Sequence, residues 1–196
     1  MINKQQYESI PDNDRFNVVF EGTAYFASIH TPKAGYKGKG KLYEVSLGLD
    51  DKGVEKANKY GLRVYSETDS IPMPHIKIRR KIDAAKGQTA ESVKPEVVDS
   101  KLRSIPSNIL IGNGSKVRVK FATFWWGDDE MGDDPSDPDG GVGTTMFKVQ
   151  VVDLVRFENG DDLGEVDGGF SLDDETSIAN EAPAKKVTNG GTIFDD

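Results

Sequence analysis

Apolar and polar residues alternate over several short stretches of this chain. In residues 41–49 the apolar positions are Tyr43, Val45, Leu47 and Leu49, with polar residues between them. Residues 74–82 and 116–126 alternate in the same way, and 145–157 is the last and strongest apolar run. A period of two is typical of strands that are buried on one face. We therefore predict strands in these four ranges.

The remaining elements are predicted from composition and boundary residues. Residues 16–30 are rich in β-branched and aromatic residues and contain Gly22, which indicates one long bent strand or two strands. Residues 50–61 open with Asp and close with Gly61, as a short helix does. Residues 95–115 combine a short strand, a turn with proline and a second apolar run. Five or six strands and at most one helix predict a small barrel or sandwich.

The pattern stops at Glu158. Residues 158–196 hold 11 acidic and 2 basic residues and few apolar ones. Such a segment cannot bury enough apolar surface to offset its conformational entropy. We therefore expect a folded domain over 1–157 and a disordered acidic tail over 158–196.

The charge distribution changes the picture further. The net charge is −8, but residues 1–127 hold 21 Lys and Arg against 14 Asp and Glu, and residues 128–196 hold 4 against 19. A basic body with an acidic end indicates a polyanionic partner, although a domain with a solvating tail has the same pattern. No stretch reaches the length of a membrane span, so no membrane partner is expected. Cysteine is absent, which suits a reducing cytoplasm.

The strand at 116–126 is the candidate for binding chemistry. Its odd positions, which include Val117, Val119 and Phe121, suit a barrel interior. Its even positions place cations and aromatic rings on one outward face: Lys116, Arg118, Lys120, Phe124 and Trp126, with Trp125 included because a bulge would reverse the parity. Cations follow phosphates and aromatic rings stack on unpaired bases. Alternation alone also supports an ordinary solvated face.

Two more basic elements accompany this strand. Lys77, Arg79 and Lys81 form a second alternating row. The glycine-rich loop at 31–41 carries Lys37 and Lys39 beside Tyr36, and could fold over a bound strand. Each would be unremarkable alone, as a solvated face or a flexible hairpin loop. Three basic elements in one acidic protein favour binding of a single-stranded nucleic acid.

No catalytic or metal chemistry is indicated. Two histidines and no cysteine make a transition-metal site improbable. The acidic run at 127–143 lacks calcium-loop spacing, and the carboxylate pairs lie in segments without the fixed geometry of acid–base catalysis. We expect no enzyme activity, no cofactor and no bound metal.

Two segments of the sequence resemble a known family. The segments "VVDSKLRSIPSNILIGNGSKVRVKF" and "FKVQVVDLVRF" resemble the single-stranded DNA-binding proteins of bacteriophage replisomes, of the T-odd coliphage type. The resemblance covers roughly residues 22–157 and the acidic character of the tail, and its specific part is 97–121. It implies an all-β fold, a five-stranded Greek-key OB barrel.

The resemblance also implies function and partners. The protein would coat single-stranded DNA in phage replication, recombination and repair, in the cytoplasm of the host cell. The tail, which ends in Phe194, Asp195 and Asp196, would contact the phage DNA polymerase and helicase/primase and compete with DNA; homodimer formation is a further implication. By motif position, Lys116, Arg118, Lys120 and Phe121 would bind DNA. Parity places Phe121 inside instead, so the two expectations conflict.

One alternative from another class stays open. A protein-interaction module would use the tail as its working part and the basic face for an acidic protein. Preference for single-stranded over duplex DNA would separate the two hypotheses.

Overall fold

The computed structural model describes residues 2–38, 40–82, 87–127 and 140–156. The predicted tail at 158–196, with its end at Phe194, Asp195 and Asp196, lies outside these residues, as do Lys39 and most of the acidic loop. The elements are, in chain order, α1 (Lys4–Glu8), α2 (Asp12–Phe16), β1 (Val18–Ala34), η1 (Tyr36–Gly38), β2 (Lys41–Gly48), α3 (Asp51–Lys59), β3 (His75–Lys81), η2 (Glu91–Val93), β4 (Glu96–Val98), β5 (Lys116–Gly127) and β6 (Gly140–Asp153).

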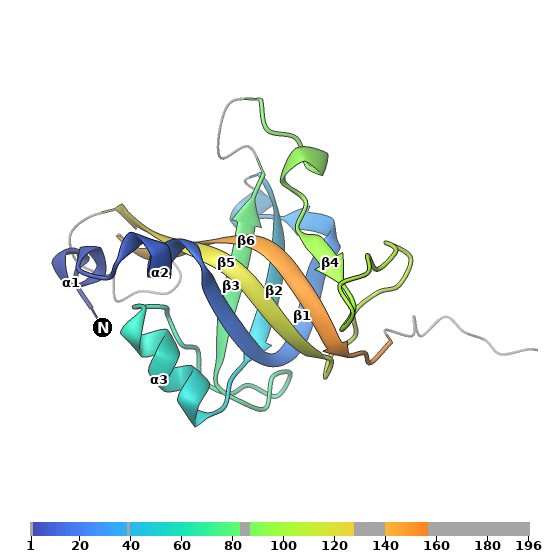
Figure 1. Ribbon diagram of the computed structural model, residues 1–196, viewed down its shortest axis with the longest axis horizontal. Helices are drawn as coiled ribbons and strands as arrows, with labels where there is room; N and C mark the ends of the chain where they lie inside the picture. The colour runs from blue at the N-terminus through green and yellow to red at the C-terminus, as the bar shows by residue number, and fades with distance from the viewer. Residues whose placement is uncertain (1, 39, 83–86, 128–139, 157–196) are drawn as a thin grey trace, which may run out of the picture. The chain divides into compact units, whose positions relative to one another are not determined.

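The strands form one sheet in the order β3-β2-β1-β5-β6-β4. All neighbours are antiparallel except β4, which pairs in parallel with β6. The two ends of the five-strand run meet, because the amide of Arg79 on β3 donates to the hydroxyl of Thr144 on β6 at 2.8 Å. Arg80 also donates to the carbonyl of Met146 at 3.0 Å. These contacts close β1, β2, β3, β5 and β6 into a barrel (Figure 1).

This strand order confirms the prediction of an all-β fold of the OB type. Two details differ from it. The short strand β4 adds a sixth member outside the barrel. Two five-residue helices precede β1, where the sequence shows no period; α1 begins at a capping box in which Asn3 and Gln6 bond each other's backbone. The helix expected over 50–61 is α3, and its first turn is capped by the side chain of Asp50.

The first strand is one bent strand of 17 residues, not two. Its first part pairs with β5 from Val18 to Thr23, and its second part pairs with β2 from Thr23 onward. Gly22 lies where the strand passes from one partner to the other. A Cβ atom at Gly22 would overlap the backbone carbonyl oxygen of Gly48. The glycine is therefore required by the close approach of two backbones.

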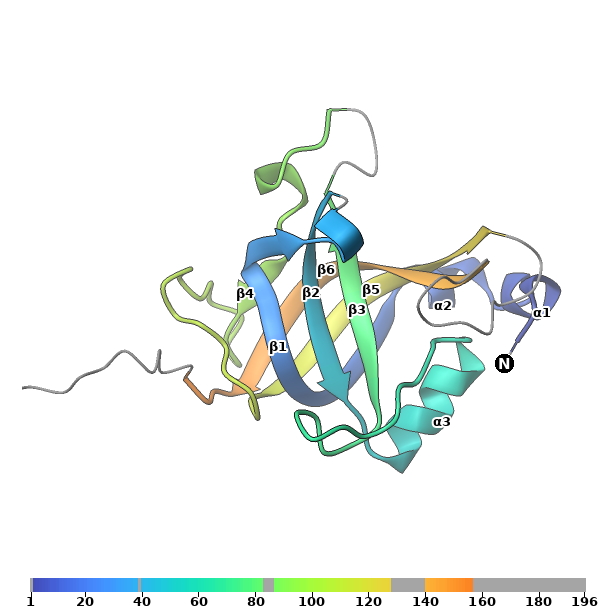
Figure 2. The ribbon, with the colours of Figure 1, turned by 180° about the vertical axis from the view of Figure 1, so that it is seen from behind.

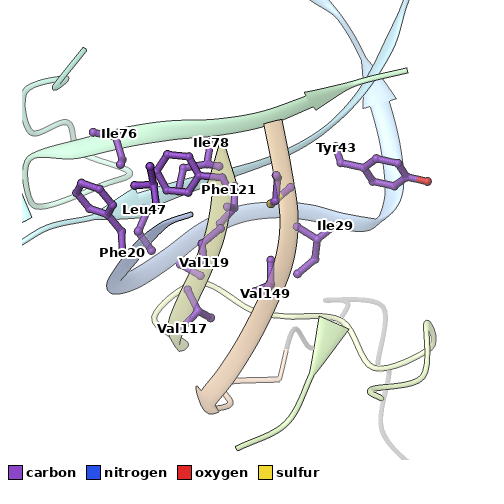
Figure 3. Close-up of a cluster of buried hydrophobic side chains, with 14 of the residues drawn as sticks. Phe20, Ile29, Tyr43, Leu47, Ile76, Ile78, Val117, Val119, Phe121 and Val149 are labelled. Atoms are coloured by element: carbon purple, nitrogen blue, oxygen red, sulfur yellow. The ribbon is translucent and has the colours of Figure 1, made fainter. Parts of the chain in front are cut away.

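The core fills the barrel with the inward residues of all five barrel strands. Leu47 of β2, Ile78 of β3 and Phe121 of β5 are fully buried, and Figure 3 shows their side chains converging. The ring of Phe20 lies 5.7 Å from that of Phe121, centroid to centroid. No helix among the described residues has the length and apolar character needed to cross a membrane.

We predict that Gly22→Ala destabilises the domain. The new methyl group meets backbone atoms, which cannot rotate away, so we expect the free energy of unfolding to fall by about 1–3 kcal/mol. Urea unfolding followed by circular dichroism measures the change. Ser100→Ala, at an exposed position, is the control and should stay within about 0.5 kcal/mol of the parent. Equal stabilities for the two variants would contradict the close approach.

Candidate nucleic-acid interface

The outward face of β5 has the predicted parity. Lys116, Arg118 and Lys120 are exposed, while Val117 and Val119 between them are buried. Farther along the strand Phe124 is 44% exposed and Trp126 is 40% exposed. The two rings that parity assigned to the surface therefore do lie there.

Two aromatic candidates are placed differently. The side chain of Phe121 is fully buried and packs on Phe20. The interior position that parity predicted for Phe121 is confirmed, and the DNA contact that the family resemblance implied for it stays a prediction. Trp125 is half-buried, with its ring centroid 5.9 Å from that of Tyr7 in α1.

The cations at the start of β5 have partners on neighbouring strands. Arg118 pairs with Glu21 of β1 at 2.6 Å and lies 3.4 Å from Gln150 of β6. The ammonium of Lys116 donates to Thr23 at 2.7 Å. Sequence reasoning missed Glu21, because the contact exists only once β1 is known to pair with β5.

The cations and aromatic rings of β5 lie toward opposite ends of the strand. Phe124 is six residues beyond Arg118, which at about 3.3 Å per residue separates them by roughly 20 Å. Strand β1 pairs with β5 only as far as Phe121, so the aromatic end of β5 extends past β1. The sequence therefore predicted correctly that the cations and the aromatic rings share one face of β5, but it did not show how far apart they lie along the strand.

The aromatic end of β5 lies one strand away from β3, across β6. Phe124 covers Gly143 of β6 so closely that a Cβ atom there would overlap its ring. The next residue, Thr144, bonds to the backbone of Arg79 on β3. Phe124 is thus next to the seam where β6 meets the second basic row.

The side chains of that second row point outward from β3. Lys77 and Arg79 are half-buried and Lys81 is exposed. The ammonium of Lys77 lies 4.6 Å from the ring centroid of Tyr65, and that ring stacks on His75 at 5.4 Å. Tyr65 was not among the residues selected from the sequence. Residue 65 forms an isolated antiparallel bridge with His75 of β3, and no local sequence pattern indicates this pairing.

A buried acid lies within this basic face. Glu44 of β2 is 6% exposed and is paired opposite Arg79. Its carboxylate accepts from Lys33 at 2.5 Å and also from Arg79. Burial acts to raise the pKa of Glu44, but the two cations outweigh it together, so its pKa lies below the ordinary value. Both cations are thereby held in fixed positions on the surface.

The turn between β1 and β2 borders the same face. Its residues 36–38 form η1, which lies at the end of β2 and β3 that carries Lys81 (Figure 2). Lys37 has a left-handed backbone with φ of 52°. In Figure 2, β2 and β3 lie in front, with this turn above them and the ends of β5 and β6 at the right. In an OB barrel, oligonucleotides commonly bind the face of strands 2 and 3, the loop between strands 1 and 2 and the loop between strands 4 and 5. The turn between β1 and β2 corresponds to the first of these loops.

Metal ligation has no support at this face. Within the described ranges, no group of three or more His, Asp or Glu side chains could hold a metal ion. The surface offers cations, backbone and aromatic rings, which suit binding of a polyanion with planar groups.

We predict that the pairing of Glu44 makes stability depend on pH. A carboxyl whose pKa is lowered on folding stabilises the native state at pH values above its ordinary pKa of 4.5. This contribution is lost as the pH falls through the lowered pKa. At pH 7, Glu44→Gln should cost about 1–3 kcal/mol of unfolding free energy. Urea titrations at pH 7 and pH 3 should show the difference from the parent shrinking at pH 3.

The matched control is Glu21→Gln, which breaks the exposed pair with Arg118. Exposed pairs contribute little, so this variant should change stability by less than about 1 kcal/mol at either pH. A deficit in Glu44→Gln that is the same at both pH values would contradict the ion-pair explanation.

No family model and no curated protein matches the chain. Among solved structures the chain is similar to gp2.5, a single-stranded DNA-binding protein encoded by bacteriophage T7, with 20% identity over 79% of this chain and 99% of that chain and a TM-score of 0.47. It is also similar to the single-stranded DNA-binding protein from bacteriophage Enc34 in complex with ssDNA, with 10% identity over 74% and 93% of the two chains and a TM-score of 0.45.

Proposed function

We propose that this protein binds single-stranded DNA without sequence specificity and coats it during phage replication and recombination, without catalysis. One observation carries the proposal. The seam between β3 and β6 places a row of cations on β3 one strand away from the exposed rings at the end of β5, across β6.

The binding surface follows from that seam. Lys77 and Lys81 on β3 would contact phosphates, and Arg79, which is paired with Glu44, would add positive charge between them. The rings of Phe124 and Trp126 would stack on bases, at about 1–3 kcal/mol per base. Duplex DNA has no splayed bases to offer, so the rings favour single strands. The turn at 36–38, which contains Lys37, would border the strand, and Tyr36 and Lys39 stay candidates from the sequence alone.

The β5 cations have a secondary part in this proposal. Arg118 is engaged by Glu21, and Lys116 by Thr23. A phosphate at this end would have to compete with these contacts. Lys120 is exposed and would extend the positive surface without forming the centre of the site.

The acidic tail would regulate access. Residues 158–196 carry 11 acidic and 2 basic residues, so the tail should compete with DNA for the basic face. Its end at Phe194, Asp195 and Asp196 would recruit the phage DNA polymerase and helicase/primase. Formation of a homodimer, which the family resemblance implies, is a further expectation.

Removing cations from β3 should weaken binding and lower its dependence on salt. Lys77→Ala with Lys81→Ala removes two phosphate contacts, and each contact to single-stranded DNA contributes about 0.7 to the slope of log affinity against log salt. We expect the slope to fall by about 1.4. Titration of oligo(dT) over a salt series, followed by tryptophan fluorescence, measures it.

The control is Lys101→Ala, which removes an exposed cation from the turn after β4. It should leave the slope unchanged. A duplex of the same length should bind more weakly than oligo(dT). Equal affinity for the two DNAs, or no response to oligo(dT) at low salt, would reject the proposal and favour a protein-interaction module.

Deleting residues 158–196 should raise the affinity for oligo(dT), most strongly at low salt. The physical reason is the loss of an internal polyanion, whose competition is screened as salt increases. Affinities of the truncated and full chains at two salt concentrations test this. An unchanged affinity would reject competition by the tail and would not contradict DNA binding.

A further inference from the structure

A pocket of about 360 Å³ lies between the N-terminal helices and the end of β5. Figure 1 shows α1 and α2 beside the far ends of β5 and β6. Phe16 of α2 lines the pocket from one side and Phe124 and Trp126 from the other, with Tyr7 and Arg15 also in its walls. Its volume falls within the range of about 300–1,000 Å³ that is usual for small-ligand sites.

The helical wall is held firmly against the strand. Tyr7 is 1% exposed, and its hydroxyl donates to Thr123 at 2.9 Å. Thr123 in turn lies 3.4 Å from the carbonyl oxygen of Arg15. The guanidinium of Arg15 lies 5.2 Å from the centroid of the Tyr7 ring. These contacts join both helices to β5, so the pocket is preformed.

Three exposed aromatic rings line this one pocket. Phe16 is 56% exposed, Phe124 is 44% exposed and Trp126 is 40% exposed. Large apolar side chains that gather on a surface mark binding sites, because their exposure is otherwise unfavourable. Flat rings on two walls suit a flat ligand that can stack between them or on one of them.

A charged group also lies in the pocket wall. The guanidinium of Arg15 is there, with one terminal nitrogen paired with Asp12. Its Nε–H group is fully buried, so a ligand in the pocket does not reach it. A nucleobase has π faces on both sides, so it matches the rings of the pocket.

We propose that this pocket holds one unpaired base of bound single-stranded DNA. The inference rests on the proposed function and extends it to a second surface. Phe124 connects the two, since it lines the pocket and also covers Gly143 beside the seam with β3. A strand that runs along β3 can therefore turn one base past Phe124 into the space below Phe16. The N-terminal segment, which the sequence pattern had left without a role, then forms part of the binding site.

The test compares two oligonucleotides of equal length and phosphate count, oligo(dT) and an abasic oligomer. Phe16→Ala removes an exposed ring from the pocket wall. We expect about a tenfold loss of affinity for oligo(dT), as one stacked base contributes. Affinity for the abasic oligomer should not change, and neither should the salt slope. Phe16→Leu, which keeps an apolar side chain but no ring, should give the same result and guards against unfolding of α2.

The outcomes separate the two proposals. If the parent binds oligo(dT) and Phe16→Ala binds it equally well, the pocket inference is overturned while the proposed function stands. Equal losses for both oligomers would also overturn it, because the ring would then act through structure or backbone. If the parent binds neither oligomer at low salt, the proposed function itself fails. A photocrosslink from 5-iododeoxyuridine to residue 16, mapped by mass spectrometry, is the positive result.

Discussion

The arrangement of this molecule depends on the closure of β3 against β6. The hydroxyl of Thr144 lies within hydrogen-bond distance of both the amide and the carbonyl of Arg79, at 2.8 and 3.3 Å. Because this contact joins β3 and β6, the two ends of the five-strand run, it helps to close that run into a barrel. It also brings the long β5–β6 ribbon beside the basic row of β3. Cations from one half of the chain and aromatic rings from the other therefore border one surface, although they are some forty residues apart in sequence.

An acidic group within the basic face is part of that arrangement. Glu44 neutralises some of the positive charge, yet it also restrains Lys33 and Arg79. Long cationic side chains lose rotamer freedom when they bind a phosphate, and a group that already orders them reduces that cost. The surface is thus less positive than a count of its lysines and arginines indicates, and more ordered. Glu21 also pairs with Arg118 on β5, but that pair is exposed to solvent and orders its cation less.

The parts of this structure that depend on short-range patterns could be predicted, and the parts that depend on pairing could not. Alternation located β2, β3, β5 and β6, and parity placed Phe121 inside, because a period of two is a local property. The partners Glu21 and Glu44 lie on strands whose register no local pattern specifies. Helix α1 was missed because it is one short turn without a period. Its Asn3 and Gln6 spacing is a capping signal that could have revealed it.

The double pairing of β1 has a consequence for how the chain folds. Strands β1, β2 and β3 are near in sequence, so their ladders close short loops. The other side of β1 must find β5, and Thr23 pairs with Lys116 across more than ninety residues. Since closing a long loop costs more entropy and long-range pairing is slow, the three-stranded meander should form first and barrel closure should follow. Until then the apolar faces of β1 and β2 are open to solvent and to other chains, so the interval before β5 docks is when this protein is most exposed to aggregation.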